Sequence, residues 1–143
     1  GVRTSFEQHG AALGNYLTDD TAQPAKFEDK VGNNSAAPRS TITPVYDSAA
    51  GFETNLERII TQKWLAMYPE GMEAWSEFRR TGYPKIFPVV TNYSGGTIDT
   101  EKQIRRLPFP QTEYDNNSAN VNQAISLLGG ADHGGTPLWW DKK

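Results

Sequence analysis

The sequence predicts a mainly all-α protein made of helix hairpins and long irregular loops, with a few short strands. Apolar residues recur at helical intervals in four segments. The two clearest of these segments are joined by a very short turn, so they must pack as an antiparallel hairpin, as in one unit of a helical-repeat protein. The hydrophobic fraction is only 36% and the mean hydropathy is −0.65, which suggests a core completed partly from outside the chain.

The first helix is expected at residues 1–17. Its interior holds Gly10 and Gly14, although glycine costs about 1 kcal/mol against alanine inside a helix. Residues 18–50 that follow are rich in Asp, Asn, Ser, Pro and Gly and predict a long loop. Such a long irregular connection is either functional or packed against structure outside the chain. The apolar positions of the helix are Val2, Phe6, Leu13 and Leu17.

The central hairpin is predicted from helices at 51–68 and 72–81. A Tyr-Pro-Glu-Gly sequence lies between them. It is expected to end the first helix, because the residue before a proline avoids helical geometry. Gly82 is placed as the C-terminal cap of the second helix. The two arginines of its last turn complement the C-terminal carbonyls and are expected to tie loops or acidic neighbours in place rather than to bind an anion. The apolar stripes are Phe52, Leu56, Ile59, Ile60, Trp64, Met67 and Tyr68 in the first helix, and Met72, Trp75 and Phe78 in the second.

The C-terminal part is expected to contain two extended, proline-punctuated stretches, at 83–90 and 104–110, and one helix at 118–128 capped by Gly129. In this helix Val121 and other apolar residues face inward. The irregular tail ends on two tryptophans, Trp139 and Trp140, which are expected to plug a groove.

Composition excludes several classes of protein. The 143 residues suit one domain, and a net charge of −3 gives no electrostatic footprint for nucleic acid. Zero cysteines exclude disulfides, thiolate nucleophiles and Cys-ligated zinc within the chain. Because helical periodicity begins within a few residues of Gly1, without a signal-peptide pattern, we expect a processed or excised chain.

No catalytic, metal or cofactor site is predicted. Glu73 and Glu77 could suggest glycoside hydrolysis, but carboxylates on one helix face do not straddle a substrate. Glu77 can instead pair with Arg80 three residues on. The only histidines, His9 and His133, have no partner at ligand spacing, and His133 is expected to be solvated.

Aromatic residues are the better candidates for binding. Rings of this kind stack on the apolar faces of sugars and other flat ligands. Tyr46 and Tyr93 lie in predicted loops and are the proposed ligand contacts. The residues assigned instead to core packing, because they fall on helical stripes, are Trp64, Trp75 and Phe78.

The sequence also resembles the C-terminal part of the SusD/RagB family of bacterial outer-membrane nutrient-binding lipoproteins. The motifs that carry the resemblance are ERIITQKWLAMYPEGMEAWSEFRRTGYPKIFP, RRLPFPQTEYDNNSANVNQAI and GGTPLWWDKK, with GVRTSFEQHG matching the helix that precedes them. Most of these are framework residues, so no ligand contact is carried over from the family.

The resemblance implies a C-terminal segment, residues 1–143, of a larger protein that contains an α-solenoid of tetratricopeptide-like hairpins. It implies non-catalytic binding of glycans or related nutrients at the extracellular face of the outer membrane, and delivery to a TonB-dependent, SusC-like transporter. The expected partners are that transporter, an oligosaccharide or other nutrient, and the remainder of the same protein N-terminal to this chain. The lipid anchor would lie in that remainder.

Two other readings stay open. The chain could be a helical scaffold that docks proteins and has no small-molecule ligand, in which case it would show no affinity for any soluble oligosaccharide. It could also be a fragment of an enzyme such as a glycosidase, which would need two carboxylates converging across a cleft.

Overall fold

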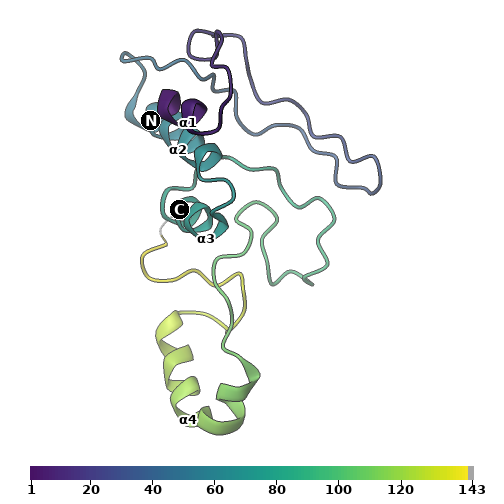
Figure 1. The fold of residues 1–143 in the computed structure, drawn as a ribbon. Helices are drawn as coiled ribbons and strands as arrows, with labels where there is room; N and C mark the ends of the chain where they lie inside the picture. Colours follow the sequence, from purple (N-terminus) through teal and green to yellow (C-terminus); the bar gives the residue numbers. More distant parts are fainter. Residues whose placement is uncertain (142–143) are drawn as a thin grey trace. The chain divides into compact units, whose positions relative to one another are not determined.

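The computed structural model describes residues 1–141 and contains four helices joined by irregular stretches (Figure 1). The chain divides into two compact units. Unit 1 comprises Gly1–Phe27 and Ala37–Phe87, and unit 2 comprises Glu28–Ala36 and Pro88–Lys143. The predicted all-helical class with long loops is confirmed. The last two residues of the chain lie outside the described part.

The first helix, α1, spans Val2–Gln8, so the prediction of a helix over residues 1–17 is wrong beyond Gln8. Gly10 and Gly14 adopt positive φ angles of +64° and +52°. Glycine reaches this left-handed region without strain, and the two residues turn the chain where the apolar pattern alone would have continued the helix.

The central hairpin forms as predicted. Helix α2 spans Phe52–Ala66 and α3 spans Gly71–Thr81, close to the expected 51–68 and 72–81. The two helices contact each other, and α2 also contacts α1. Gly82 has φ +75° and its N–H donates to the Phe78 carbonyl at 2.8 Å. This left-handed cap is the one that the Gly-Tyr-Pro sequence predicts.

Helix α4 spans Gln111–Leu128 and ends at Gly129, whose φ is +72°. The prediction of 118–128 therefore found the second half of the helix and missed its start. Asn117 has non-helical angles (φ −145°, ψ 31°), so the helix is kinked at the point where the predicted segment begins. The residues before the kink are polar and mostly exposed, which is why no apolar periodicity marks them.

The few short strands are not formed: within residues 1–141 the elements are the four helices alone. The stretches at 83–90 and 104–110 contain no strand, and each contains two prolines. Proline has no N–H to donate to a strand ladder, and these stretches make only isolated backbone hydrogen bonds, such as those from Val89 N–H to the Thr100 carbonyl and from Arg105 N–H to the Gly134 carbonyl.

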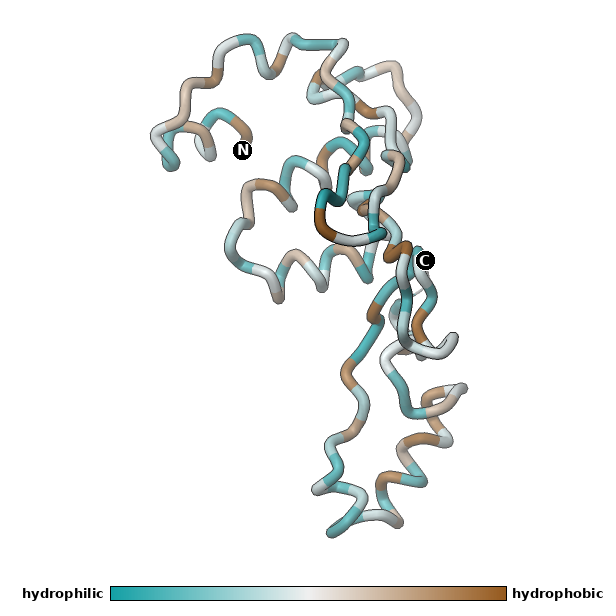
Figure 2. Tube along the Cα trace, turned by 90° about the vertical axis from the view of Figure 1, so that its right-hand side faces the viewer, coloured by the Kyte–Doolittle hydropathy of each residue, from teal (hydrophilic) through white to brown (hydrophobic). Residues whose placement is uncertain are grey.

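The described residues bury few apolar side chains. Figure 2 shows short hydrophobic stretches separated by hydrophilic ones along the whole trace. Of the predicted stripe residues, Ile60, Phe78 and Val121 are buried. By contrast, Trp64 is 38% exposed and Trp139 is 83% exposed. The expectation that Trp139 plugs a groove is therefore wrong for the described residues, and Trp64 is only partly covered, so the expectation that it lies in a core is wrong as well.

Candidate functional site

An apolar groove of about 980 Å³ lies within unit 1. Its walls come from α1 and the turns after it, from the loop at 44–46, and from one face of α2. Tyr46, one of the two predicted ligand contacts, lines this groove and is 63% exposed. The apolar and aromatic wall residues include Val2, Phe6, Tyr16, Leu17, Val45, Ile59, Leu65 and Ala66.

Several polar groups of the groove already have partners. The Tyr16 hydroxyl donates to Oε1 of Gln62 at 3.0 Å, and the Tyr16 ring lies 5.1 Å from that of Phe6, centroid to centroid. Nη1 of Arg58 donates to Oδ1 of Asn55 at 3.1 Å. These contacts brace the walls and leave the groove with a mainly apolar inner surface.

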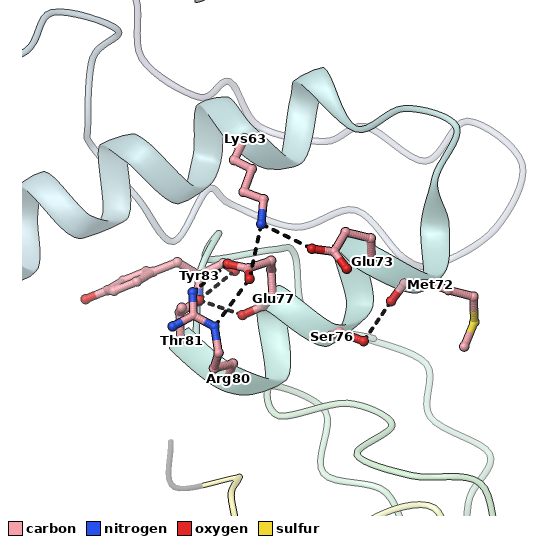
Figure 3. Close-up of polar contacts among 8 residues, drawn as sticks. All are labelled: Lys63, Met72, Glu73, Ser76, Glu77, Arg80, Thr81 and Tyr83. Carbon is pink, nitrogen blue, oxygen red and sulfur yellow. Dashed lines mark hydrogen bonds and ion pairs between the residues drawn. The ribbon is translucent and has the colours of Figure 1, made fainter. Parts of the chain in front are cut away.

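A network of charges joins α2 to α3 (Figure 3). Nζ of Lys63 on α2 lies 3.2 Å from a carboxylate oxygen of both Glu73 and Glu77 on α3. Arg80 Nη2 approaches the other oxygen of Glu77 at 2.7 Å. The two carboxylates share a helix face, as the sequence predicts, and they are ion-paired within the hairpin.

This network sets the ionisation of Glu77. The hydrogen bond from Arg80 is the largest cause that lowers the pKa of the Glu77 carboxyl, and Lys63 lowers it further, although burial opposes both. The same partners raise the pKa of the Lys63 ammonium, through Glu73 first and then Glu77. A carboxylate held ionised in this way is suited to structure, whereas a general acid needs a raised pKa.

The stretch from Trp75 to Arg80 mostly hides its large side chains. Phe78 is 7% exposed and Arg79 is 8% exposed. The Arg79 guanidinium carbon lies 3.7 Å above the centroid of the Trp75 ring, a cation–π geometry. The expectation that the last-turn arginines hold acidic neighbours is confirmed for Arg80, whereas Arg79 stacks on an aromatic ring.

Tyr93, the second predicted ligand contact, lies in unit 2 and is 94% exposed. The loop that carries it is braced on both sides. Nδ2 of Asn92 donates to the Ile98 carbonyl at 2.8 Å, and the Ser94 N–H donates to Oδ1 of Asn92 at 2.9 Å. Thr91 N–H donates to Oδ1 of Asn34 at 3.0 Å. The ring is thus displayed from a loop fixed by hydrogen bonds.

Two arginine–aspartate pairs hold the tail of unit 2 against the extended stretch at 104–110. Arg105 Nε donates to Asp141 Oδ2 at 2.7 Å, and the side chains are 4% and 0% exposed. Arg106 pairs with Asp132. Sequence reasoning missed both aspartates, because partners 26 and 36 residues apart leave no periodic signal.

Asp132 collects further donors. The Tyr114 hydroxyl donates to Oδ2 at 2.6 Å and the Phe109 N–H donates at 3.0 Å. Burial raises the pKa of the Asp132 carboxyl, but the hydrogen bonds from Tyr114, Arg106 and Phe109 together outweigh burial, and the pKa falls below its ordinary value. Asp132 is therefore held as an anion that organises the surrounding loops.

The histidines do not form a ligand cluster. His9 follows α1 and lines the groove. His133 is half-buried and its Nδ1 accepts the Gly135 N–H at 3.1 Å, so the expectation of a solvated histidine is wrong. No group of three or more His, Asp or Glu side chains within residues 1–141 is placed to hold a metal ion. Over the same residues, no helix has the length and apolar character needed to cross a membrane.

Comparison with known proteins places these features in one family. The SusD-like family model, described as "Susd and RagB outer membrane lipoprotein", matches residues 1–141. A comparison with curated proteins finds no match.

Similar solved structures cover almost the whole chain. A chitin-binding SusD homologue from Flavobacterium johnsoniae is 47% identical with a TM-score of 0.89, and the match covers 99% of this chain and 30% of that one. A SusD homologue from Bacteroides uniformis is 46% identical with a TM-score of 0.91, over 99% and 30% of the two chains. One from Bacteroides vulgatus is 49% identical with a TM-score of 0.82, over 99% and 29%. The chain thus spans about 30% of the length of these relatives, and it belongs to the SusD-like family.

Proposed function

We propose that this chain is part of a non-catalytic protein that binds glycans or related nutrients at the extracellular face of the outer membrane. The protein then delivers them to a TonB-dependent, SusC-like transporter. The observation that carries this proposal is family membership over residues 1–141, together with 47% identity to a homologue described as chitin-binding.

The side chains support binding rather than catalysis. The carboxylates that could have suggested hydrolysis, Glu73 and Glu77, pair with Lys63 and lie on one helix face. A glycosidase instead needs one carboxyl with a raised pKa facing a second across the substrate, whereas the pKa of Glu77 is lowered.

We propose Tyr93 as the stronger candidate for ligand contact and Tyr46 as the second. Tyr93 is 94% exposed on a loop fixed by the Asn92 and Asn34 hydrogen bonds. A loop held in this way loses little conformational freedom when a sugar stacks on the ring that it carries. Tyr46 borders the apolar groove of unit 1 and is 63% exposed.

The test is calorimetric titration of the complete protein with oligomers of N-acetylglucosamine, the sugar unit of chitin. If Tyr93 stacks on the ligand, Tyr93→Ala should weaken binding roughly five- to tenfold, since an aromatic stacking contact is worth about 1 kcal/mol. Tyr93→Phe should retain most of the affinity, because the ring remains.

Tyr68→Ala is the matched control, since Tyr68 is also a highly exposed tyrosine, at 82%, but lies at the tip of the α2–α3 hairpin. Its affinity should equal that of the parent protein. Failure to bind any soluble oligosaccharide at millimolar concentration would contradict the glycan proposal. Co-purification with a TonB-dependent transporter tests the delivery step separately.

A second candidate function is protein docking. The groove between α1 and α2 is lined mainly by apolar side chains, which favours a protein segment over a sugar. In this alternative the fold is the same but the protein has no small-molecule ligand. The titrations with oligosaccharides described above distinguish glycan binding from protein docking.

A further inference from the structure

Two loops of unit 2 are joined by hydrogen bonds, although they are far apart in the sequence. They are residues 28–36 and 88–98, the paired loops. The Thr91 N–H donates to Oδ1 of Asn34 at 3.0 Å, and the Thr91 hydroxyl donates to the Asn33 carbonyl at 3.3 Å. Tyr93 is two residues beyond Thr91, so its Cα lies within about 7 Å of the Thr91 Cα. The hydrogen bonds therefore bring Asn33 close to the exposed Tyr93.

The loop that carries Asn33 is braced by the carboxylate of Asp29. Its Oδ1 accepts the Val31 N–H at 3.0 Å and the Gly32 N–H at 2.8 Å, and its Oδ2 accepts the Asn34 N–H at 3.0 Å. A Cβ at Gly32 would lie 2.8 Å from that Oδ2, so this close approach of the carboxylate to the backbone requires glycine. Both paired loops are thus fixed by hydrogen bonds of their own.

Asn33 is the asparagine of the paired loops that takes no part in this bracing. Asn34 accepts from Thr91, and Asn92 donates to the Ile98 carbonyl. By contrast, Asn33 is exposed, and its side-chain amide has no hydrogen-bond partner within residues 1–141. A free amide on a surface is ordinary by itself. A free amide on a braced loop close to an exposed aromatic ring is the combination of polar and apolar groups that a small ligand needs.

We infer that Asn33 hydrogen-bonds the ligand that stacks on Tyr93, and that this ligand is an uncharged glycan. The inference rests on the proposed function and adds to it a second contact residue and a class of sugar. A sugar that stacks on an aromatic ring by its apolar face turns its hydroxyl groups outward, toward the side chains around that ring. The Asn33 amide offers two donors and one acceptor oxygen, which match groups that both donate and accept.

The charges of the paired loops favour an uncharged sugar. Residues 31–36 and 88–98 contain no charged side chain. The remaining residues, Glu28, Asp29 and Lys30, bring two carboxylates and one ammonium, a net charge of −1. Strong recognition of an acidic sugar would need arginine or lysine in excess against its carboxylate. The paired loops instead offer amide, hydroxyl and backbone groups beside an aromatic ring.

The test is calorimetric titration of the complete protein with chitohexaose and cellohexaose as uncharged probes and a hyaluronan hexasaccharide as the acidic probe. With the uncharged probe that binds more tightly, Asn33→Ala should weaken binding roughly two- to tenfold, the range for one lost hydrogen bond between neutral groups. The hyaluronan hexasaccharide should bind the parent protein more weakly than that probe.

Asn122→Ala is the matched control, because Asn122 is also an exposed asparagine of unit 2 but lies on α4. Its affinity should equal that of the parent protein. The urea midpoints of both variants should also equal the parent's. Among the non-glycine residues 1–141 only Gln103 has a positive φ, so alanine at position 33 introduces no backbone strain. A loss of affinity at an unchanged midpoint therefore reports contact with the ligand.

The outcomes separate this inference from the proposed function. If an uncharged probe binds and Asn33→Ala binds it as tightly as the parent protein, the assignment of Asn33 is overturned, whereas glycan binding stands. Tighter binding of the hyaluronan hexasaccharide than of both uncharged probes would overturn the class of sugar and likewise leave glycan binding intact. If none of the three probes binds, both the proposed function and the inference are contradicted, and a protein contact at the paired loops is favoured.

Discussion

Replacing Asp141 with alanine should destabilise unit 2 strongly. Asp141 is the sole carboxylate in the tail motif Leu-Trp-Trp-Asp, and its side chain is fully buried beside Arg105. Arg105 is itself only 4% exposed and donates from Nε to Asp141 at 2.7 Å. The substitution leaves a buried guanidinium without its carboxylate partner.

The magnitude follows from the cost of breaking a buried ion pair, about 3–5 kcal/mol when one partner is removed. Arg105 keeps the hydrogen bond from Nη1 to the Lys102 carbonyl at 3.0 Å, so we expect the lower end, about 3 kcal/mol. In urea denaturation this loss appears as a lower midpoint, because the free energy of unfolding falls linearly with urea concentration.

The assay is urea denaturation of the complete protein, followed by tryptophan fluorescence, with Trp140 adjacent to the substitution. Asp115→Ala is the control, because Asp115 is an exposed carboxylate on α4 in the same unit. The control should change the free energy of unfolding by less than about 0.5 kcal/mol. The double variant Arg105→Leu/Asp141→Leu should be more stable than Asp141→Ala, because it removes the buried charge as well.

The reasoning is refuted if Asp141→Ala is as stable as Asp115→Ala. Such a result would mean that the pair contributes little and that Arg105 reaches water or another acceptor when Asp141 is gone.

Three further predictions concern single residues. Glu77→Gln should lower the free energy of unfolding at neutral pH and make it less sensitive to acid. The folded-state pKa of Glu77 lies below the ordinary 4.5, so its contribution to stability is complete above pH 4.5 and is lost as pH falls through the folded-state pKa. Urea midpoints of variant and parent that depend on pH in the same way would contradict this. Gly135→Ala should cost about 1–3 kcal/mol, because a Cβ there would collide with the Thr97 carbonyl. Gly71→Ala, with open space around its Cβ position, serves as its control in thermal melts and should be neutral or stabilising. Thr81→Val should cost about 1–3 kcal/mol, because the buried hydroxyl donates to the Glu77 carbonyl at 2.7 Å; an unchanged urea midpoint would show that this bond contributes nothing.

Local sequence signals predicted the helices where the signal was apolar and periodic. Gly82 and Gly129 were identified as caps because positive φ angles favour glycine, and the structure confirms both. Gly10 and Gly14 adopt the same conformation, but the apolar residues on either side of them suggested a continuous helix. The first half of α4 was missed because its polar sequence carries no apolar periodicity.

Of the two candidate sites, one could be predicted from the sequence and the other could not. The sequence predicts Tyr93 as a ligand contact because it is an aromatic residue in a polar loop, and the structure adds that it is exposed on a braced loop. The groove beside Tyr46 could not be predicted, since its walls come from α1, from 44–46 and from α2. Spacing along a helix says which residues share a face, but it does not say which faces find a partner.

The sequence by itself determined the helical class, the α2–α3 hairpin and membership in the SusD-like family, because helical periodicity, turn residues and framework motifs are all local patterns. Only the tertiary structure decided that Trp64 and Ile59 remain exposed and that Arg105 and Arg106 pair with Asp141 and Asp132. The physical reason is the same in both cases. Burial and ion pairing depend on segments that meet in space after tens of intervening residues, and no period along the chain records that meeting.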